Sequence, residues 1–205
     1  MVLLPFLGHS DPENCSRGTG CPLHDFSDLD PKAWYHDGIH FALEEGLMNG
    51  TGGNTFSPNA AITRGMVVTI LYRVEGSPAA SLQKSFSDVS YDAWYGAAVS
   101  WAAANGIVTG DDDGTFRPNA AITREQMAAI LGRYAAYKGD YTVDYYTENA
   151  LSAYPDAGSV SGYAVKYMNW AVSEGLINGM DGKLNPTGTA TRAQAAAILY
   201  RYLTK

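Results

Sequence analysis

The sequence predicts an all-α protein, mainly helical with long loops, built from three repeats of one helical unit. The hexapeptide NAAITR at residues 59–64 recurs letter for letter at 119–124, and a weaker copy, ATRAQ, follows at 190–194. After each copy, apolar residues return at i, i+3, i+4 and i+7, which is the spacing of one buried helix face. In the second repeat these residues are Met127, Ile130, Leu131 and Tyr134.

Each copy also carries a signal for the start of its helix. A threonine stands at the expected first position, where its hydroxyl can accept a first-turn N–H as an N-cap; the three are Thr63, Thr123 and Thr191. Gln126 and Gln194, three residues on, are placed to complete capping boxes, whereas Met66 cannot do so. An arginine follows each cap, although the helix dipole disfavours positive charge there. Its recurrence indicates a further role for the arginine.

The repeats form one composite domain, residues 26–205, preceded by an arm. We expect the arm, 1–25, to be irregular because it is rich in Pro, Gly, Ser and Asn and has no hydrophobic period. The predicted repeats are 26–75, 86–137 and 154–205, and the linkers are 76–85 and 138–153. Each helix has one apolar stripe, so the copies must cover one another. Three units supply every face that this cluster needs, which predicts a pseudo-threefold monomer.

Composition excludes several classes of function. With 46% hydrophobic and 17% charged residues, the chain has the balance of a folded globular protein. A net charge of −7, without a lysine- or arginine-rich patch, argues against a nucleic-acid partner. No apolar run has the length of a membrane span, so we predict no membrane insertion. We find no nucleophile–base–acid set and no phosphate-binding loop, and we predict a non-catalytic protein without a cofactor or a metal site.

Both cysteines, Cys15 and Cys21, lie in the arm. A disulfide between them would close a small loop and would fit an oxidising compartment. His9 and His24 are close in the sequence, but the spacing of these four residues matches no usual zinc pattern. The disulfide is therefore favoured over zinc, and two thiols remain the third interpretation.

Two other patterns match metal sites only in part. His36 and His40 lie one turn apart on the first helix of repeat one, but no third ligand is evident, and repeats two and three lack them. The acidic run at 111–113 lacks the alternating ligands and the distal glutamate of an EF-hand, which favours a solvated turn. Neither pattern changes the prediction that the chain has no metal site.

Several short motifs recur in a fixed order along the chain. They are the Phe/Tyr-x-Asp openings at 26–28, 86–88 and 154–156, the Trp-Tyr pairs at 34–35 and 94–95, the Gly-x-x-x-Gly steps at 46–50, 106–110 and 175–179, the Gly-Thr-Phe-x-Pro loop at 114–118 and the Ile-Thr-Arg helix starts at 62–64 and 122–124. In this order the chain resembles three S-layer homology (SLH) repeats over residues 26–205. The resemblance implies a bacterial cell-wall anchoring module at the extracellular cell surface, folded as a pseudo-threefold spindle around a central three-helix bundle.

The resemblance also implies a ligand, an anionic secondary cell-wall polysaccharide with a pyruvylated sugar, held in grooves between neighbouring repeats. The binding residues that it implies are the helix-start arginines Arg64, Arg124 and Arg192, the opening aspartates Asp28, Asp88 and Asp156, and the aromatic residues Trp34, Trp94 and Tyr163. Repeat one departs from the family pattern at 65–66, and repeat three lacks the tryptophan and the isoleucine before its threonine. These departures predict that the grooves are not equivalent.

The arginines suit such a ligand chemically. A helix N-terminus offers N–H donors, and a guanidinium beside it would complete a compact site for the carboxylate of a pyruvate ketal. We expect Arg124 to be the main anchor, because repeat two keeps every motif. Simpler interpretations remain open at the other positions, since aspartate commonly forms turns and tryptophan rings are usually mostly buried.

Two other functions fit the repeats. One is a structural module through which surface-layer proteins assemble, and the other is the anchoring fragment of a larger extracellular hydrolase. Binding to purified cell walls, measured before and after chemical removal of pyruvate, separates polysaccharide binding from protein assembly.

Overall fold

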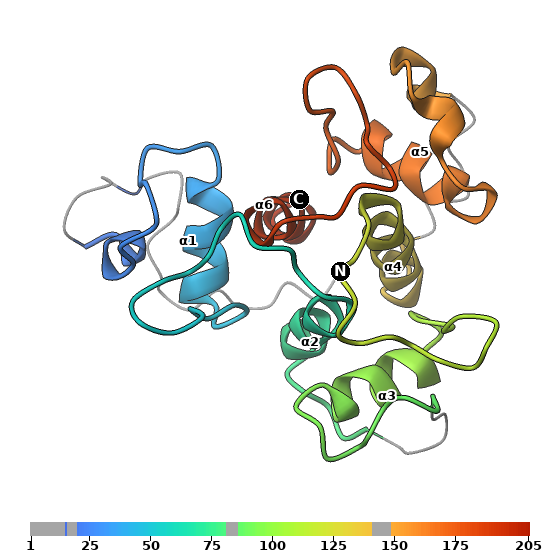
Figure 1. Cartoon of the computed structure of the whole chain (residues 1–205), viewed down its shortest axis with the longest axis horizontal. Helices are drawn as coiled ribbons and strands as arrows, with labels where there is room; N and C mark the ends of the chain where they lie inside the picture. The colour runs from blue at the N-terminus through green and yellow to red at the C-terminus, as the bar shows by residue number, and fades with distance from the viewer. Residues whose placement is uncertain (1–14, 16–19, 81–85, 141–148) are drawn as a thin grey trace. The chain divides into compact units, whose positions relative to one another are not determined.

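The computed structural model describes residues 15, 20–80, 86–140 and 149–205, and its regular structure is helical (Figure 1). Six α-helices form among these residues: α1 (His36–Glu44), α2 (Arg64–Val74), α3 (Gly96–Ala104), α4 (Arg124–Tyr137), α5 (Val165–Ser173) and α6 (Arg192–Leu203). Within the described ranges no strand forms, and extended segments meet only in isolated bridges. The predicted all-α class is confirmed, whereas the threefold spindle stays a prediction. No helix in the described part of the chain is long and apolar enough to cross a bilayer.

Short 3₁₀ turns occupy two segments that the sequence predicts to be irregular. They are η2 (Pro22–Asp25) in the arm and η4 (Ala150–Ala153) in the second linker. Each turn buries one leucine, Leu23 or Leu151. A single leucine among polar residues leaves no periodic pattern, which explains why the sequence does not reveal these turns. Residues 1–14 and 16–19 of the arm, and 81–85 and 141–148 of the linkers, lie outside the described residues.

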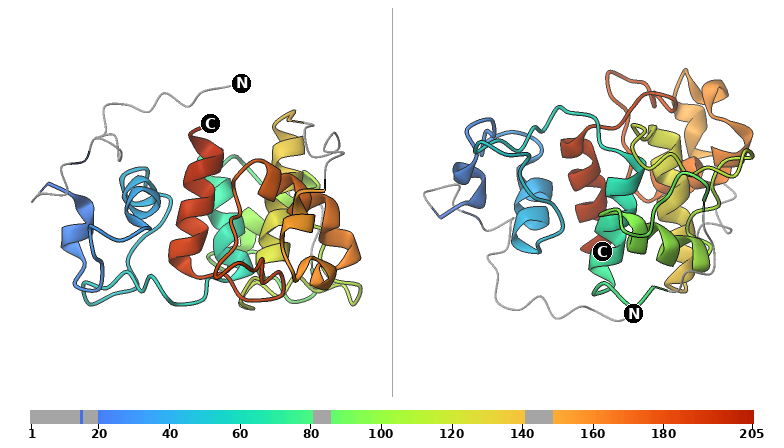
Figure 2. Two further views of the ribbon diagram at one scale, coloured as in Figure 1. Left: turned by 90° about the horizontal axis from the view of Figure 1, so that it is seen from above. Right: turned by 60° about the horizontal axis from the view of Figure 1, so that its bottom comes forward.

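The chain folds into two compact units, one of residues 1–60 with 191–205 and one of residues 61–190. In the first unit α1 packs against α6, and Gly38 permits the approach because a Cβ there would lie 2.7 Å from the backbone of Ala197. In the second unit α2 packs against α3, and α4 packs against α5; Figure 2 gives two further views of these pairs. Each short helix is therefore covered by the long helix of a neighbouring repeat.

The threonine caps predicted for the long helices are confirmed. Each hydroxyl oxygen lies between 3.2 and 3.3 Å from the N–H nitrogen three residues on. Gln126 and Gln194 also accept the N–H of Thr123 and Thr191, which completes two capping boxes. Met66 has no group that could do this, so α2 has the cap alone.

The residues just before the caps form a closed ring of backbone hydrogen bonds in the second unit. Ile62 donates its N–H to the carbonyl of Ala190 at 3.0 Å, Ala190 donates to Ile122 at 2.9 Å, and Ile122 donates back to Ile62 at 3.0 Å. All three side chains are fully buried. The ring therefore joins one residue from each repeat.

Candidate functional site

Each long helix starts with a buried arginine. The exposed fraction is 9% for Arg64, 3% for Arg124 and 6% for Arg192. In every case the Nε–H donates to a main-chain carbonyl in a loop of the next repeat: Arg64 to Phe116 at 2.7 Å, Arg124 to Leu184 at 2.7 Å and Arg192 to Phe56 at 2.9 Å. A buried guanidinium needs such acceptors because it stays charged. The recurring arginine therefore holds a loop, a role that the sequence alone does not show.

The outer nitrogens distinguish Arg64 from the other two arginines. Nη2 of Arg124 donates to the carbonyl of Asn178 at 2.8 Å, and Nη2 of Arg192 donates to that of Asn49 at 2.6 Å. Nη2 of Arg64 lies instead 3.8 Å from Oδ1 of Asp111, which is longer than a hydrogen bond. Burial lowers the pKa of Arg64, and the charge of Asp111 opposes this effect. Among the described residues, one edge of the Arg64 guanidinium is therefore not hydrogen-bonded to the main chain.

The first N–H groups of the long helices are already hydrogen-bonded within the protein. In α2, Arg64 and Gly65 donate their N–H groups to the carbonyls of Ala120 and Pro118, at 3.0 and 2.8 Å. The first two N–H groups of α4 and of α6 are bonded in the same way to loop carbonyls. The expectation that a helix N-terminus supplies donors for a carboxylate is therefore wrong, because loops of the protein already accept these N–H groups.

The opening aspartates hold the same loops. Each carboxylate accepts two successive main-chain N–H groups between 2.7 and 2.9 Å: Asp28 from Phe56 and Ser57, Asp88 from Phe116 and Arg117, and Asp156 from Leu184 and Asn185. The second residue of each pair has a φ between 49° and 58°, which is uncommon for a residue other than glycine. The N–H bond from Leu184 is the main cause that lowers the pKa of Asp156. The geometry favours the turn-forming interpretation of these aspartates.

The three predicted aromatic residues are exposed to solvent. The exposed fraction is 65% for Trp34, 59% for Trp94 and 50% for Tyr163, so these three residues are not part of the core. Trp34 meets Tyr35 edge to face, and Trp94 meets Tyr95 in the same way. Tyrosine and tryptophan, which combine an apolar ring with a polar group, are enriched at interfaces.

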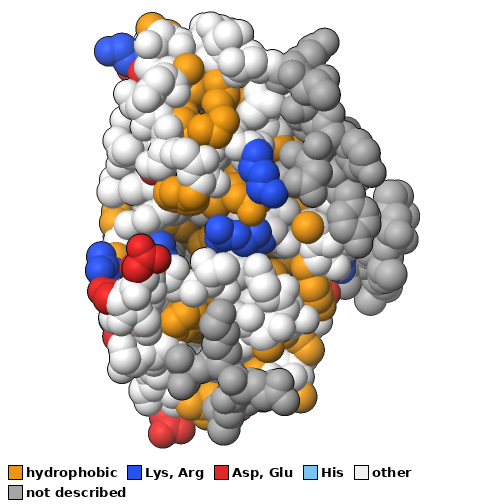
Figure 3. All heavy atoms as spheres, turned by 90° about the vertical axis from the view of Figure 1, so that its right-hand side faces the viewer, with side chains coloured by type: hydrophobic (Ala, Val, Ile, Leu, Met, Phe, Trp, Pro, Cys, Tyr) orange, Lys and Arg blue, Asp and Glu red, His pale blue; other side chains and the backbone are white. Residues whose placement is uncertain are grey.

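Charged and aromatic side chains from all three repeats surround Arg64 within the second unit. We call this set the Arg64 cluster, and it consists of Arg64, Asp111, Arg117, Glu125 and Tyr163. Oδ2 of Asp111 lies 3.3 Å from Nε of Arg117, and Arg64 is near enough to act electrostatically on the hydroxyl of Tyr163. Burial raises the pKa of Tyr163, the charge of Glu125 raises it further, and Arg64 opposes both. Figure 3 shows Lys and Arg side chains beside hydrophobic side chains on one face of the molecule.

Glu125 is a member of the cluster that sequence reasoning missed. Its side chain is 4% exposed and accepts both the N–H and the O–H of Ser161, at 2.9 and 2.7 Å. The other repeats have Gly65 and Ala193 at this position, so no repeated pattern marks it. Glu125 fixes the segment that carries Tyr163. In the sequence, only the presence of a glutamate where the other repeats have small residues points to this role.

The acidic turn at 111–113 is solvated, as predicted. Asp113 is exposed and accepts bonds from the hydroxyl and N–H of Thr115, and one from Arg117. These hydrogen bonds, with that of the Thr115 hydroxyl the strongest, lower the pKa of Asp113 to about 2. The carboxylate of Asp113 therefore stabilises the turn in which it lies.

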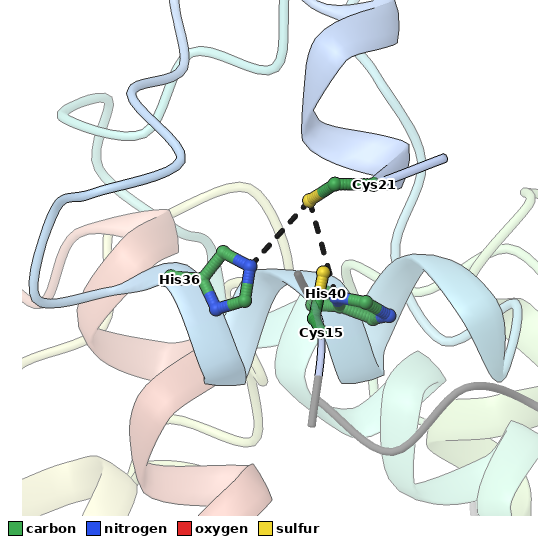
Figure 4. Close-up of side chains that lie close together, drawn as sticks. All are labelled: Cys15, Cys21, His36 and His40. Carbon is green, nitrogen blue, oxygen red and sulfur yellow. Dashed lines mark hydrogen bonds between the residues drawn. The ribbon is translucent and has the colours of Figure 1, made fainter. Parts of the chain in front are cut away.

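The two cysteines are thiols in this structure, and the disulfide that the sequence favours is not formed. Cys21 is buried, and burial raises the pKa of its thiol. Cys15 and Cys21 lie beside His36 and His40, which the sequence left without a third ligand (Figure 4). Of the two histidines that the sequence placed near the cysteines, His24 is outside this group, and His9 lies outside the described residues.

Comparison with known proteins identifies the repeats. The family model of the S-layer homology domain matches residues 25–65, 85–128 and 153–196. An endoglucanase from Bacillus sp. (strain KSM-635) is 35% identical over 88% of this chain. A surface-layer 125 kDa protein from Lysinibacillus sphaericus is 31% identical over 87% of the chain, and a cellulosome-anchoring protein from Acetivibrio thermocellus is 26% identical over 77%.

The chain spans only part of these relatives, 19% of the endoglucanase, 15% of the surface-layer protein and 35% of the cellulosome-anchoring protein. The endoglucanase thus matches only through its S-layer homology region. The matched segments cover the three helix starts and the three opening aspartates described above. The chain belongs to the S-layer homology domain family, and it is a cell-wall anchoring module of the extracellular cell surface.

Proposed function

We propose that this module, which we take to be non-catalytic, binds an anionic cell-wall polysaccharide through the Arg64 cluster, and that it recognises the carboxylate of a pyruvylated sugar. The observation that carries the proposal is the outer edge of Arg64, whose Nη2 lies 3.8 Å from Asp111 rather than on a main-chain carbonyl. A guanidinium presents paired N–H donors that match a carboxylate. The corresponding Nη2 atoms of Arg124 and Arg192 already bond to carbonyls.

Tyr163 supplies the second contact in this proposal. Its ring is half exposed, and the positive charge of Arg64 acts on its hydroxyl. An aromatic ring offers a broad apolar face with a polar hydroxyl at its edge, which suits a sugar ring. A single pyruvylated sugar would then place its carboxylate on Arg64 and its ring against Tyr163. Arg124, Arg192, Asp28, Asp88, Asp156, Trp34 and Trp94 stay candidates for the other repeats.

An acidic ligand meets a protein of net charge −7, so long-range attraction does not help binding. Affinity must come from local donors such as the Arg64 guanidinium. Directional hydrogen bonds in a partly buried site are screened by salt less than exposed charges are. We therefore expect binding to weaken only modestly as salt is added, and to be lost when the carboxylate is removed from the sugar.

Calorimetry with a pyruvylated disaccharide tests the site. Arg64→Ala should weaken binding roughly 10- to 100-fold, the usual range for losing hydrogen bonds to a charged group. Arg64→Lys should restore only part, because an ammonium lacks the two-pronged geometry. Tyr163→Ala should also weaken binding, whereas Tyr137→Ala, an aromatic residue 40% exposed at the other end of α4, should not. Unchanged affinity in both Arg64→Ala and Tyr163→Ala would rule out this site.

Sedimentation with purified cell walls tests the ligand independently of the site. The module should bind intact walls and lose binding after the pyruvate is removed chemically. If binding survives that treatment, the ligand is not the pyruvate carboxylate. If the module instead co-sediments with surface-layer proteins in the absence of wall polysaccharide, protein assembly is the better description.

A further inference from the structure

Four side chains of types that bind metals converge in the first unit, and none of them is assigned to the polysaccharide. They are Cys15 from the arm, Cys21 just before η2, and His36 and His40 from α1 (Figure 4). One ligand atom of each lies within 4.8 Å of all the others. Sγ of Cys21 is 3.4 Å from Nε2 of His36 and 4.0 Å from Nδ1 of His40.

The histidine rings are already oriented for a metal at the centre. Nδ1 of His36 lies 2.6 Å from Oδ1 of Asp37, and Nε2 of His40 lies 3.0 Å from Oε1 of Glu44. A neutral imidazole that donates to a carboxylate through one nitrogen keeps a lone pair on the other. This arrangement leaves the lone pairs on Nε2 of His36 and Nδ1 of His40, and these are the atoms that lie near Sγ of Cys21. Carboxylates in this outer position are a regular feature of histidine–zinc sites.

The surroundings exclude water from three of the four groups. His36 and His40 are 1% and 0% exposed, and Cys21 is 3% exposed. Both histidines are on one face of α1, because residues four apart lie one above the other on a helix. Two fully buried imidazoles are unusual in a core, because a polar ring nitrogen costs free energy when it leaves water without a partner.

We propose that Cys15, Cys21, His36 and His40 bind one zinc ion in a closed, tetrahedral, structural site. Two sulfur and two nitrogen ligands are a preferred set for zinc. With Zn–S near 2.3 Å and Zn–N near 2.0–2.1 Å, neighbouring ligands in a tetrahedron are roughly 3.3–3.8 Å apart. The separation of 3.4 Å between Cys21 and His36 lies in that range, and that of 4.0 Å between Cys21 and His40 is slightly wider. Because no two ligand atoms are more than 4.8 Å apart, no pair has to contract by more than about 1.5 Å. All four positions are filled by protein, so the ion would have no site for a substrate.

The third repeat shows what the metal would do. There η4 is held on α5 by Asn169, whose Oδ1 accepts the N–H of Ala150 at 2.8 Å. His40 occupies the position of Asn169 on the first helix of repeat one, and Cys21 precedes η2 as Asn149 precedes η4. In repeat one, a histidine and a cysteine therefore stand where repeat three has this hydrogen bond. Zinc would hold η2 and Cys15 on α1, as the hydrogen bond holds η4 on α5 in repeat three.

Metal content and cobalt spectra of the full chain test the proposal without any variant. The reduced protein, loaded with zinc and freed of excess metal, should retain about one zinc per chain by mass spectrometry, as a single tetrahedral site requires. Cobalt(II) should give the intense d–d bands of a tetrahedral ion together with thiolate-to-cobalt charge transfer. A chelator should remove the metal and lower the melting temperature, because the ion binds only the folded chain. Octahedral cobalt without thiolate bands would overturn the site.

Substitutions then identify the ligands. Cys21→Ser and His40→Asn should abolish the tetrahedral cobalt spectrum; His40→Asn introduces the residue that repeat three uses, which favours a folded variant. Asp37→Asn and Glu44→Gln should each lower zinc affinity about 10- to 100-fold while the spectrum is retained. His24→Ala, an exposed histidine outside the group, is the matched control and should change nothing. A chain that is isolated with a Cys15–Cys21 disulfide and retains no zinc after reduction would show the proposal to be wrong.

Discussion

At the scale of residues, the helix-start arginines and the opening aspartates mainly make hydrogen bonds within the protein. Arginine Nε–H and helix N–H groups bind the carbonyls of a loop, while the aspartate binds N–H groups of the same loop. Each loop is therefore held from both sides by charged groups. In the second unit this internal network leaves the outer edge of Arg64 and the exposed rings of Tyr163 and Trp94 without such a role, and the proposed binding of a carbohydrate depends on groups of this kind.

Arg124→Ala should destabilise the fold before it affects binding. Its removal leaves the carbonyl of Leu184 without its donor, at roughly 1–3 kcal/mol for an unsatisfied buried group, and also removes the bond to the carbonyl of the exposed Asn178. Urea titration should show a lower midpoint with an unchanged slope. Arg117→Ala is the control, because that arginine is exposed and bonds only within its own turn in the contacts of the described residues. Equal effects of the two substitutions would contradict the loop-holding role.

Acid should weaken the loop that Asp156 holds. The folded pKa of Asp156 lies below its ordinary value of 3.8, mainly because of the N–H of Leu184. The carboxylate therefore adds stability above pH 3.8, and this contribution is lost as the pH falls from 3.8 through the lower folded pKa. Asp156→Asn should flatten the dependence of unfolding on pH below 4, measured by thermal melts. A variant that keeps the full slope would show that other carboxylates cause it.

At the scale of elements, the residues that start a helix are close together in the sequence. The contacts of the same helix start with other repeats join residues that are far apart in the sequence. Thr63, Thr123 and Thr191 are predictable because a cap and its box lie within four residues. The loop carbonyls that bind the same helix ends lie far along the chain, so no short pattern announces them. Cys21 and His40 show the same limit, since their spacing matches no known metal pattern and only folding brings them together.

Thr123→Ala should lower stability by roughly 1 kcal/mol, the usual contribution of an N-cap. Thr63→Ala should lower it less, because Met66 cannot complete a capping box. Denaturant melts of both variants provide the comparison. Equal losses would mean that the glutamine half of the box contributes nothing.

Gly38→Ala should destabilise α1 although alanine is the better helix former. The added methyl carbon would lie 2.7 Å from the backbone of Ala197, and overpacking of this kind typically costs 1–3 kcal/mol, so we expect a loss of about that size. Gly158→Ala is the control, because a Cβ at that position meets nothing within 4 Å. If calorimetric melts show no loss for Gly38→Ala, α1 does not pack on α6 as described.

At the scale of the whole molecule, the units of folding differ from the units of sequence. One unit combines the start of repeat one with the last helix of repeat three, and the other holds residues 61–190. The sequence predicts that the copies cover one another, but not which helices pair. Apolar stripes alone could not decide this, because all long helices carry the same stripe. The threefold spindle and the proposed domain boundaries remain predictions.

The chain should be a monomer in solution. Every short helix among the described residues is already covered by a long helix of the same chain, so no apolar helix face requires a second copy. Light scattering at low protein concentration should give the mass of one chain. A stable trimer under those conditions would mean that the repeats pair between chains rather than within one.

The hydrogen-bond ring of Ile62, Ile122 and Ala190 has a consequence for synthesis. Two of its three bonds involve Ala190, so a ribosome that has released only the first two repeats cannot yet close it. Contacts between distant residues form slowly, because the intervening chain must first be drawn into a loop. The ring therefore cannot close until the third repeat has emerged, although α2 and α3 of the first two repeats can already pack together.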